Sequence, residues 1–316
     1  MDTIYRLEIP VPFAVETVNV FLIKGDSLTL VDTGTNTAEA RLALQAGLGE
    51  LGYRLSDIET VIITHHHVDH SGLLNDFSET AAIIGHPRNE PWISQNPDFL
   101  ACYEQFFQDI VPQFGIPEVI AKYGPPMKRT LAYASKRSLS AAVQEGDRLD
   151  FLPEFTVIET PGHASTHIAL FREQDGLMIG GDALLGHISS NPLLEPPYFG
   201  ETERKKPLLE YNDTLRRLGE MPISRILPGH GSDVTQVSEL VAERLKKQEA
   251  RAQKVLNMLK EKPMTAFEIC IQLFPTLYTK QFALTLSETV GQLDFLEYNQ
   301  QILLDTSVAE WMYYAK

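Results

Sequence analysis

The chain has 316 residues, of which 43% are hydrophobic, and it carries a formal net charge of −15 at pH 7. This composition is typical of a globular protein with a sizeable core. The acidic charge argues against a protein whose main role is to bind the phosphate backbone of nucleic acids. The first residues lack the basic and apolar stretches of a signal peptide, and no apolar run has membrane-spanning length. We therefore expect a cytoplasmic protein that does not enter a membrane.

The first part of the chain is predicted to contain strands and one helix. Residues 18–23 and 28–31 are β-rich runs joined across Gly25-Asp26, which is a hairpin signal. Residues 38–51 carry leucines at helical spacing and predict an amphipathic helix. The apolar run 61–64 then predicts a short buried strand.

The segment Thr64-His65-His66-His67-Val68-Asp69-His70 follows that strand directly. Four of its side chains (His65, His67, Asp69, His70) suit zinc, iron or manganese. Ligands collect at the carboxyl ends of strands in α/β sheets, so the position favours a metal site over a histidine-rich surface loop. His66 should point away from its two neighbours if strand-like alternation continues.

A helical insertion is predicted over about residues 92–137. Residues 98–111 place aromatic side chains at helical spacing, and prolines and glycines then break the segment. We expect it to pack over the strand ends, where its aromatic stripe belongs to the core, forms a dimer contact or covers the site as a lid. The basic residues at its end either form a solvated helix face or hold an anionic group of the substrate. These residues are Lys128, Arg129, Lys136 and Arg137.

The second half repeats the order of strands followed by a helix. Strands are predicted at 145–151, 155–159, 167–172, 177–179 and 224–227, and a helix at 203–218. The repeated order indicates an α/β protein in which two sheets lie between helices, an αβ/βα sandwich.

The last part of the chain is predicted to be largely helical. Helices are expected at 237–260, 265–274 and 280–296, followed by a short strand at 301–304. The middle helix opens with the capping box Thr265-Ala266-Phe267-Glu268. We therefore divide the chain into a catalytic domain, 1–235, and a small C-terminal domain, 236–316, that resembles a winged helix.

The charge of this C-terminal domain argues against nucleic-acid binding. Its third helix places Lys280 against Glu288, Asp294 and Glu297, which is a poor electrostatic footprint for reading a duplex. We interpret the domain as a packing or dimerisation element, and a homodimer is our expectation for the assembly.

Three further strand ends carry a candidate ligand beside glycine. They are Thr160-Pro161-Gly162-His163, Ile179-Gly180-Gly181-Asp182 and Leu227-Pro228-Gly229-His230-Gly231. Glycine lets the backbone approach closely and leaves the neighbouring side chain accessible. Each motif alone is weak, but together with the first cluster they predict a metal centre built from several strands.

With Val31-Asp32-Thr33-Gly34 added, the motifs resemble in order those of the metallo-β-lactamase superfamily, over about residues 5–231. The resemblance implies a four-layer αβ/βα sandwich that binds two divalent ions. We expect these ions to be Zn²⁺, with iron or manganese as alternatives. It implies one ion held by His65, His67 and His163, and a second held by Asp69, His70 and His230. Asp182 would bridge the two.

Three other residues near these motifs need an interpretation. Asp32 resembles a family residue that orients a ligand, and its alternative is a structural turn carboxylate. His167 matches a position that supports the site by hydrogen bonding, although Ala164-Ser165-Thr166 departs from the family pattern beside it. His187 follows Asp182 by five positions, and we expect a surface or structural role for it.

The carboxylate at the bridging position resembles the glyoxalase II-like dinuclear branch rather than members with a cysteine ligand. That implies a hydrolase that uses a bridging hydroxide, with Asp69 as the catalytic residue that accepts its proton. We expect a small-molecule substrate, an ester or thioester, and no nucleic-acid partner. A nuclease or phosphodiesterase and a lactonase are alternatives, and a mononuclear-iron persulfide dioxygenase and a DNA-binding regulator fit less well.

Overall fold

The computed structural model describes residues 3–121 and 130–316. Its first sheet contains β1 (Thr3–Pro10), β2 (Thr17–Lys24), β3 (Leu28–Val31), β4 (Thr60–Ile62), β5 (Ala82–Gly85) and β6 (Ala141–Ala142), in that order. Neighbours are antiparallel from β1 to β3 and parallel from β3 to β6. The parallel pairing brings the carboxyl ends of β3 and β4 to the same edge.

The second sheet runs in the order β11-β10-β9-β8-β7. Its strands are β7 (Arg148–Leu149), β8 (Leu152–Glu159), β9 (Ile168–Arg172), β10 (Leu177–Gly181) and β11 (Arg225–Pro228). Strands β10 and β11 are parallel, and the other pairs are antiparallel.

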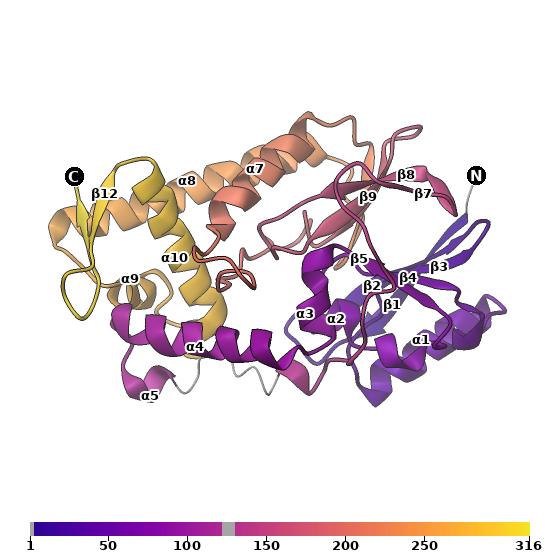
Figure 1. Cartoon of the computed structure of the whole chain (residues 1–316). Helices are drawn as coiled ribbons and strands as arrows, with labels where there is room; N and C mark the ends of the chain where they lie inside the picture. The colour runs from indigo at the N-terminus through magenta and orange to yellow at the C-terminus, as the bar shows by residue number, and fades with distance from the viewer. Residues whose placement is uncertain (1–2, 122–129) are drawn as a thin grey trace.

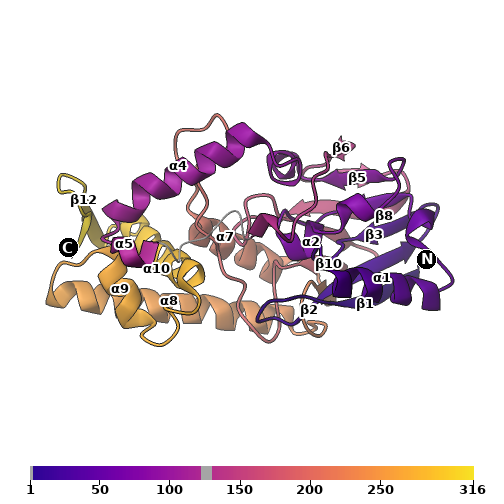
Figure 2. The same cartoon turned by 90° about the horizontal axis from the view of Figure 1, so that it is seen from below.

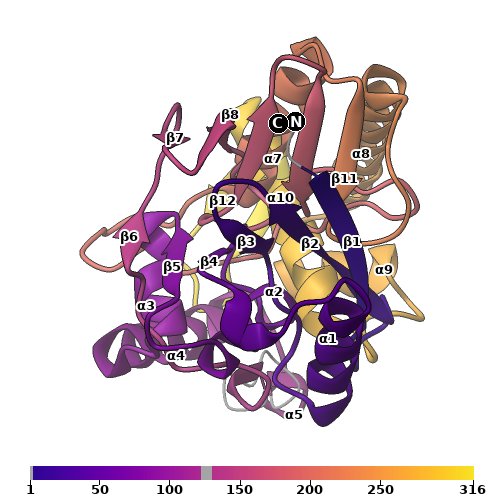
Figure 3. The same ribbon diagram turned by 90° about the vertical axis from the view of Figure 1, so that its right-hand side faces the viewer.

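Helices cover the outer face of each sheet, as Figures 1 and 3 show. Helix α1 (Ala38–Glu50) packs on the first sheet, and α7 (Pro207–Glu220) and the start of α8 (Val237–Glu261) pack on the second. A third apolar cluster fills the space between the sheets. The expected αβ/βα sandwich is therefore confirmed.

Short helices connect these elements. They are α2 (Val68–Ser71), α3 (Glu90–Ile93), α5 (Glu118–Ala121) and the 3₁₀ turns Leu55–Asp57, Leu74–Asp76 and Pro87–Asn89. No helix in the described ranges is long and apolar enough to cross a membrane.

Helix α4 (Pro97–Gln113) leaves the sandwich and reaches the C-terminal elements, as Figures 1 and 2 show. Asn96 caps it by accepting hydrogen bonds from the backbone N–H groups of Asp98 and Phe99. Ile110 and Phe114 enter the same apolar cluster as the C-terminal helices. The insertion therefore connects the sandwich to the C-terminal helices.

The C-terminal elements are α9 (Ala266–Leu273), α10 (Phe282–Tyr298) and a hairpin of β12 (Ile302–Asp305) and β13 (Met312–Ala315). The capping box is confirmed by reciprocal hydrogen bonds between Thr265 and Glu268. Helix α8 contributes to the apolar clusters of both the sandwich and the C-terminal part. The domain boundary near residue 235 and the winged-helix resemblance stay predictions.

Four of the described strands had no predicted range, and one predicted strand was placed wrongly. Strand β1 was not predicted, although it alternates buried Leu7 and Ile9 with exposed Arg6 and Glu8. Strands β5, β6 and β13 also had no predicted range. The predicted strand at 145–151 is wrong apart from Arg148–Leu149, because Gly146 has φ +85° and a turn forms there.

Candidate metal centre

All seven predicted metal ligands meet at one edge of the sandwich. The first sheet supplies those that follow β4: His65 and His67, with Asp69 and His70 on α2. The second sheet supplies His163, Asp182 and His230, which follow β8, β10 and β11. Their ligand atoms fall into three overlapping groups, and within each group all lie within 4.8 Å of one another.

The first group contains three imidazole nitrogens. His67 Nδ1 lies 2.9 Å from His65 Nε2 and 3.0 Å from His163 Nε2. Three nitrogens around one tetrahedral zinc, each at about 2.0–2.1 Å, lie roughly 3.3 Å apart. The spacing is therefore close to what one cation would impose.

The second group contains two histidines and a carboxylate. Asp69 Oδ2 lies 3.4 Å from His230 Nε2 and 4.0 Å from His70 Nε2. Asp182 contacts both groups: its carboxylate oxygens lie 3.4 Å from His163 Nε2 and 3.5 Å from the Nε2 atoms of His70 and His230. This is the position that a bridging ligand requires.

The second ring nitrogen of three histidines is held by the surrounding chain. His163 Nδ1 lies 3.0 Å from the Asn191 carbonyl oxygen, and His230 Nδ1 lies 2.5 Å from that of Thr17. His70 Nδ1 lies 2.8 Å from Asp32 Oδ2. Such contacts fix the tautomer that directs Nε2 into the site.

Asp32 is held in an unusual backbone conformation. Its φ of 62° lies in the left-handed region, which costs a non-glycine residue free energy unless its surroundings fix it. Its carboxylate accepts hydrogen bonds from the Thr64 backbone N–H at 2.8 Å and from the Thr64 hydroxyl at 2.9 Å. Asp32 thus links the end of β3 to the segment after β4, and it contacts His70 as an orienting residue would.

His167 has both ring nitrogens engaged within the protein. Its Nδ1 lies 2.6 Å from the Thr160 hydroxyl, and its Nε2 accepts from the Asp182 backbone N–H at 2.9 Å. It therefore has no nitrogen left for a metal, and it holds the backbone that carries Asp182.

Gly162 makes close packing behind His163 possible. Its φ is +125°, and a Cβ atom there would lie 2.4 Å from the Tyr211 Cα on α7. We expect Gly162→Ala to lower the free energy of unfolding by about 3 kcal/mol or more, from backbone strain and overpacking together. Urea unfolding measures this. Gly49→Ala on α1 has nothing within 4 Å of its new Cβ, so it should be neutral or stabilising, and equal losses would contradict the prediction.

The charge of the centre suits a divalent cation. Burial alone would lower the pKa of His70, but Asp32, Asp182 and Asp69 raise it to about 9. Burial would also lower the pKa of His230, but Asp182 and Asp69 raise this pKa to about 11. Cation binding would displace these protons.

Two buried atoms of the described centre also lack hydrogen-bond partners, His70 Nε2 and Asp182 Oδ1. Both point into the ligand groups, where a cation would satisfy them. The residues present therefore fit bound metal.

Two other histidines do not join the ligand groups. His66 lies outside the ligand groups, although its ring centroid is 4.8 Å from that of His67: its Nδ1 lies 3.0 Å from the Thr166 hydroxyl, and its ring stacks on Trp92 with centroids 4.1 Å apart. His187 is exposed.

The basic residues considered as an anion site do not form one in the described structure. Arg137 is half-buried and donates to the carbonyl oxygens of Leu74, Phe77, Ser78 and Ala81, so its guanidinium is engaged within the protein. Lys136 is exposed. Lys128 and Arg129 lie outside the described residues.

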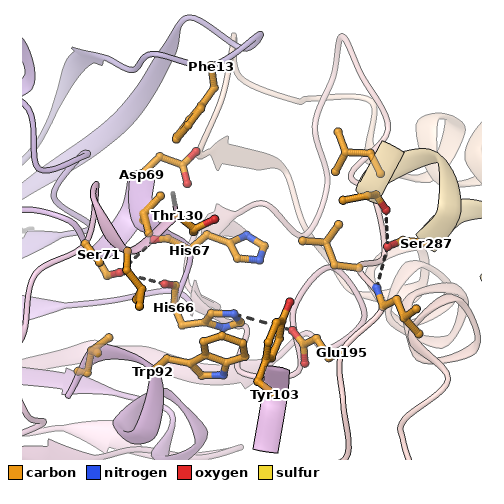
Figure 4. Close-up of a pocket in the computed structure, with 18 of the residues that line it drawn as sticks. Phe13, His66, His67, Asp69, Ser71, Trp92, Tyr103, Thr130, Glu195 and Ser287 are labelled. Atoms are coloured by element: carbon orange, nitrogen blue, oxygen red, sulfur yellow. Dashed lines mark hydrogen bonds and ion pairs between the residues drawn. The ribbon is translucent and has the colours of Figure 1, made fainter. Parts of the chain in front are cut away.

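A cavity of about 380 Å³ opens beside the metal centre (Figure 4). His67 and Asp69 form part of one wall, and most of the rest is apolar. Tyr103 and Phe107 of α4 line it, so part of the predicted aromatic stripe faces the site.

Sequence reasoning missed Trp92 and Glu195 as cavity residues. Trp92 lies between the rings of His66 and Tyr103, with centroids 4.1 and 5.2 Å away. Glu195 lies in an irregular segment without a motif, so no sequence signal marked it. Its carboxylate accepts from the Ser165 backbone N–H and lies 4.0 Å from His66 Nε2.

Burial raises the pKa of Glu195 to about 7 from an ordinary value of 4.5. Its contribution to stability is therefore present below pH 4.5 and is lost as the pH rises through 7. Glutamine does not ionise, so Glu195→Gln should remove this loss. Between pH 4.5 and 8, we expect the free energy of unfolding of the variant to rise by about 3 kcal/mol relative to that of the wild type. Denaturant unfolding across this range measures it, and a difference that is constant with pH would contradict it.

Comparison with known proteins agrees with this geometry. The profile of the metallo-beta-lactamase superfamily matches residues 14–230. The probable metallo-hydrolase YqjP of Bacillus subtilis is 47% identical over 301 residues, covering 95% of this chain and 94% of that protein. The crystal structure of the metallo-beta-lactamase family protein TTHA1429 from Thermus thermophilus matches with a TM-score of 0.83 at 28% identity, over 99% of this chain and 98% of that one.

A more distant relative has a named activity. An atrochrysone carboxyl ACP thioesterase of Aspergillus fumigatus is 22% identical over 236 residues, covering 74% of this chain and 57% of that protein.

Proposed function

Because the chain belongs to the metallo-β-lactamase superfamily, we propose that this metallo-hydrolase uses two divalent cations to cleave an ester or thioester with an apolar acyl group. We assign it to the glyoxalase II-like dinuclear branch of the superfamily, because the Asp182 carboxylate lies within 3.5 Å of histidines from both ligand groups. Zinc is the metal we propose, with iron and manganese as alternatives.

The observation that carries the proposal is the cavity beside Asp69 and His67. Its volume of about 380 Å³ suits a small molecule. Leu131, Leu193 and Leu286 are among its apolar lining residues, and the described part of the lining contains no lysine or arginine. An apolar acyl group fits such a wall, whereas the described lining offers a phosphodiester backbone no lysine or arginine side chain.

The C-terminal part also argues against a nucleic-acid substrate. Helix α10, which would be the recognition helix of a winged helix, is buried over most of its length. Of its acidic residues, Glu288 and Asp294 pair with Arg251 and Arg204 instead of facing solvent. A DNA-binding regulator requires the opposite arrangement.

The donor set assigns the ions to named residues. His65, His67 and His163 would hold one, Asp69, His70 and His230 the other, with Asp182 shared. When bound, such ions lower the pKa of water and polarise a carbonyl oxygen.

The chain's own residues would complete the reaction. Asp69 accepts the proton of the attacking water on its carboxylate. His70 and His230 lower the pKa of this carboxyl against the opposing effect of burial, so Asp69 stays ionised at neutral pH. The apolar wall binds the acyl group and excludes bulk water. The water oxygen bonds to the acyl carbon, the C–S or C–O bond breaks, and Asp69 returns the proton to the departing thiolate or alkoxide.

One distant relative supports the reaction class. The thioesterase from Aspergillus fumigatus is named for cleaving an acyl carrier protein thioester.

The test is metal analysis of the purified protein, followed by assays of thioesters, esters, lactones, phosphodiesters and single-stranded RNA. We expect about two equivalents of metal and the fastest turnover on a thioester or ester. Faster cleavage of RNA or a phosphodiester would overturn the proposal in favour of a nuclease.

A further inference from the structure

The C-terminal helix α10 forms the wall of the cavity that faces the metal centre. We infer that the first two turns of α10 limit the length of the apolar group that the enzyme accepts. This inference rests on the proposed function for its meaning in catalysis. It gives the C-terminal part a role in substrate selection.

The lining of the cavity shows this wall directly. Ala283, Leu284, Leu286 and Ser287 all belong to α10 and line the same cavity as His67 and Asp69. Figure 4 shows Ser287 across the cavity from Asp69 and His67. A substrate whose scissile bond lies at the metal centre therefore directs its far end toward α10.

The chemistry of this end is apolar. Ala283, Leu284 and Leu286 are aliphatic, and Phe107 of α4 lines the cavity with them. Ser287 is engaged within the protein, because its hydroxyl donates to the Ala283 carbonyl at 2.7 Å. The wall therefore favours the end of a hydrocarbon chain or ring over a charged group.

Hydrogen bonds fix the distance from this wall to the metal centre. The Asn191 side-chain amide donates to the Leu284 carbonyl at 3.0 Å, and the Leu194 backbone N–H donates to Ser287 Oγ at 3.0 Å. The Asn191 carbonyl in turn contacts His163 Nδ1 at 3.0 Å. One short segment thus holds both a ligand histidine and α10, so the cavity has a set length.

Ala283→Phe tests the inference by filling the end of the cavity. Ala283 is half-buried and lines the cavity, so a benzyl group there shortens the space left for the substrate. Across thioesters from acetyl to decanoyl, we expect the ratio of kcat/KM for the longest chains to kcat/KM for acetyl to fall about ten-fold or more. The same exchange at Ala101, which is exposed on α4 and does not line the cavity, should leave the profile as in the wild type.

Leu284→Ala provides the opposite change without a new bulky group. Leu284 is 38% exposed, so its truncation removes little of the core. We expect the preference to move toward longer chains. A chain-length profile unchanged in both variants would overturn the inference.

Binding separates this inference from the proposed reaction. Neutral alcohols from butanol to decanol are titrated calorimetrically into the wild-type and Ala283→Phe proteins as purified, with their metal content matched. We expect the affinity to rise with chain length in the wild type and to level off at a shorter chain in the variant. This result supports the inference even if no ester or thioester is cleaved. In that case only the proposed function fails. Equal length dependence in the two proteins overturns the inference.

Discussion

Asp69→Asn is expected to retain the fold and the bound metal while kcat falls by about 10²–10⁴-fold. The amide has nearly the shape of the carboxylate but cannot accept the proton of the attacking water. Asp69 lines the cavity and, among the described residues, makes ionic contacts only with His70 and His230, so the exchange disturbs little packing. Steady-state kinetics, with metal content measured on the same sample, gives the result.

The control for Asp69→Asn is the same exchange at Asp213, whose side chain is 77% exposed on α7. That variant should behave as the wild type. If Asp69→Asn kept near wild-type turnover with its metal in place, Asp69 would not be the proton acceptor, and the assignment would fail.

Asp182→Asn should have the second large effect, and this effect falls on metal binding. Asp182 is the one carboxylate within 3.5 Å of histidines from both ligand groups, among the residues that the structure describes. We expect the variant to retain one equivalent of metal or less and to lose more than about 100-fold in activity. Metal analysis after dialysis measures the first effect.

The same exchange should destabilise the metal-free protein. Burial alone would raise the pKa of Asp182, but His230 and His70 lower it well below its ordinary value, so it is ionised beside charged histidines. Removing one partner of such a buried pair costs about 3–5 kcal/mol. Denaturant unfolding of the metal-free protein measures this loss.

Asp294→Asn separates the two effects of Asp182→Asn. Asp294 is also buried and pairs with Arg204 at 2.6 Å, away from the metal centre. This variant should lose stability but keep its metal content. If both variants kept their metal, Asp182 would not bridge the ions.

The ligand set could be predicted from the sequence because each part of it is local. His65, His67, Asp69 and His70 stand within six positions directly after a buried strand, and three glycine-flanked strand ends repeat the pattern. Strand ends at the same edge of a sheet lie together, and the sandwich packs the two sheets face to face, so the ligands of both sheets meet at one edge. The structure brings all seven residues together, and their roles as ligands stay predictions.

Local sequence patterns also predicted most of the helices and longer strands, and the failures have identifiable causes. Thr265 and Glu268 marked the start of α9 because a capping box is a contact between residues three apart. The predicted strand at 145–151 failed because Gly146 adopts a positive φ and turns the chain. Strand β1 was missed although its alternation was readable, so this was an error of interpretation.

What the sequence determined by itself is the reacting end of the site, the histidines and carboxylates that follow the strands. What only the tertiary structure decided is the binding end. The cavity takes its walls from Trp92, Tyr103, Glu195 and the start of α10, which lie far apart in the chain. Their meeting depends on how α4 and α10 pack across the molecule. The packing of apolar faces is non-directional, so the local spacing of residues does not predict which apolar faces will pack together.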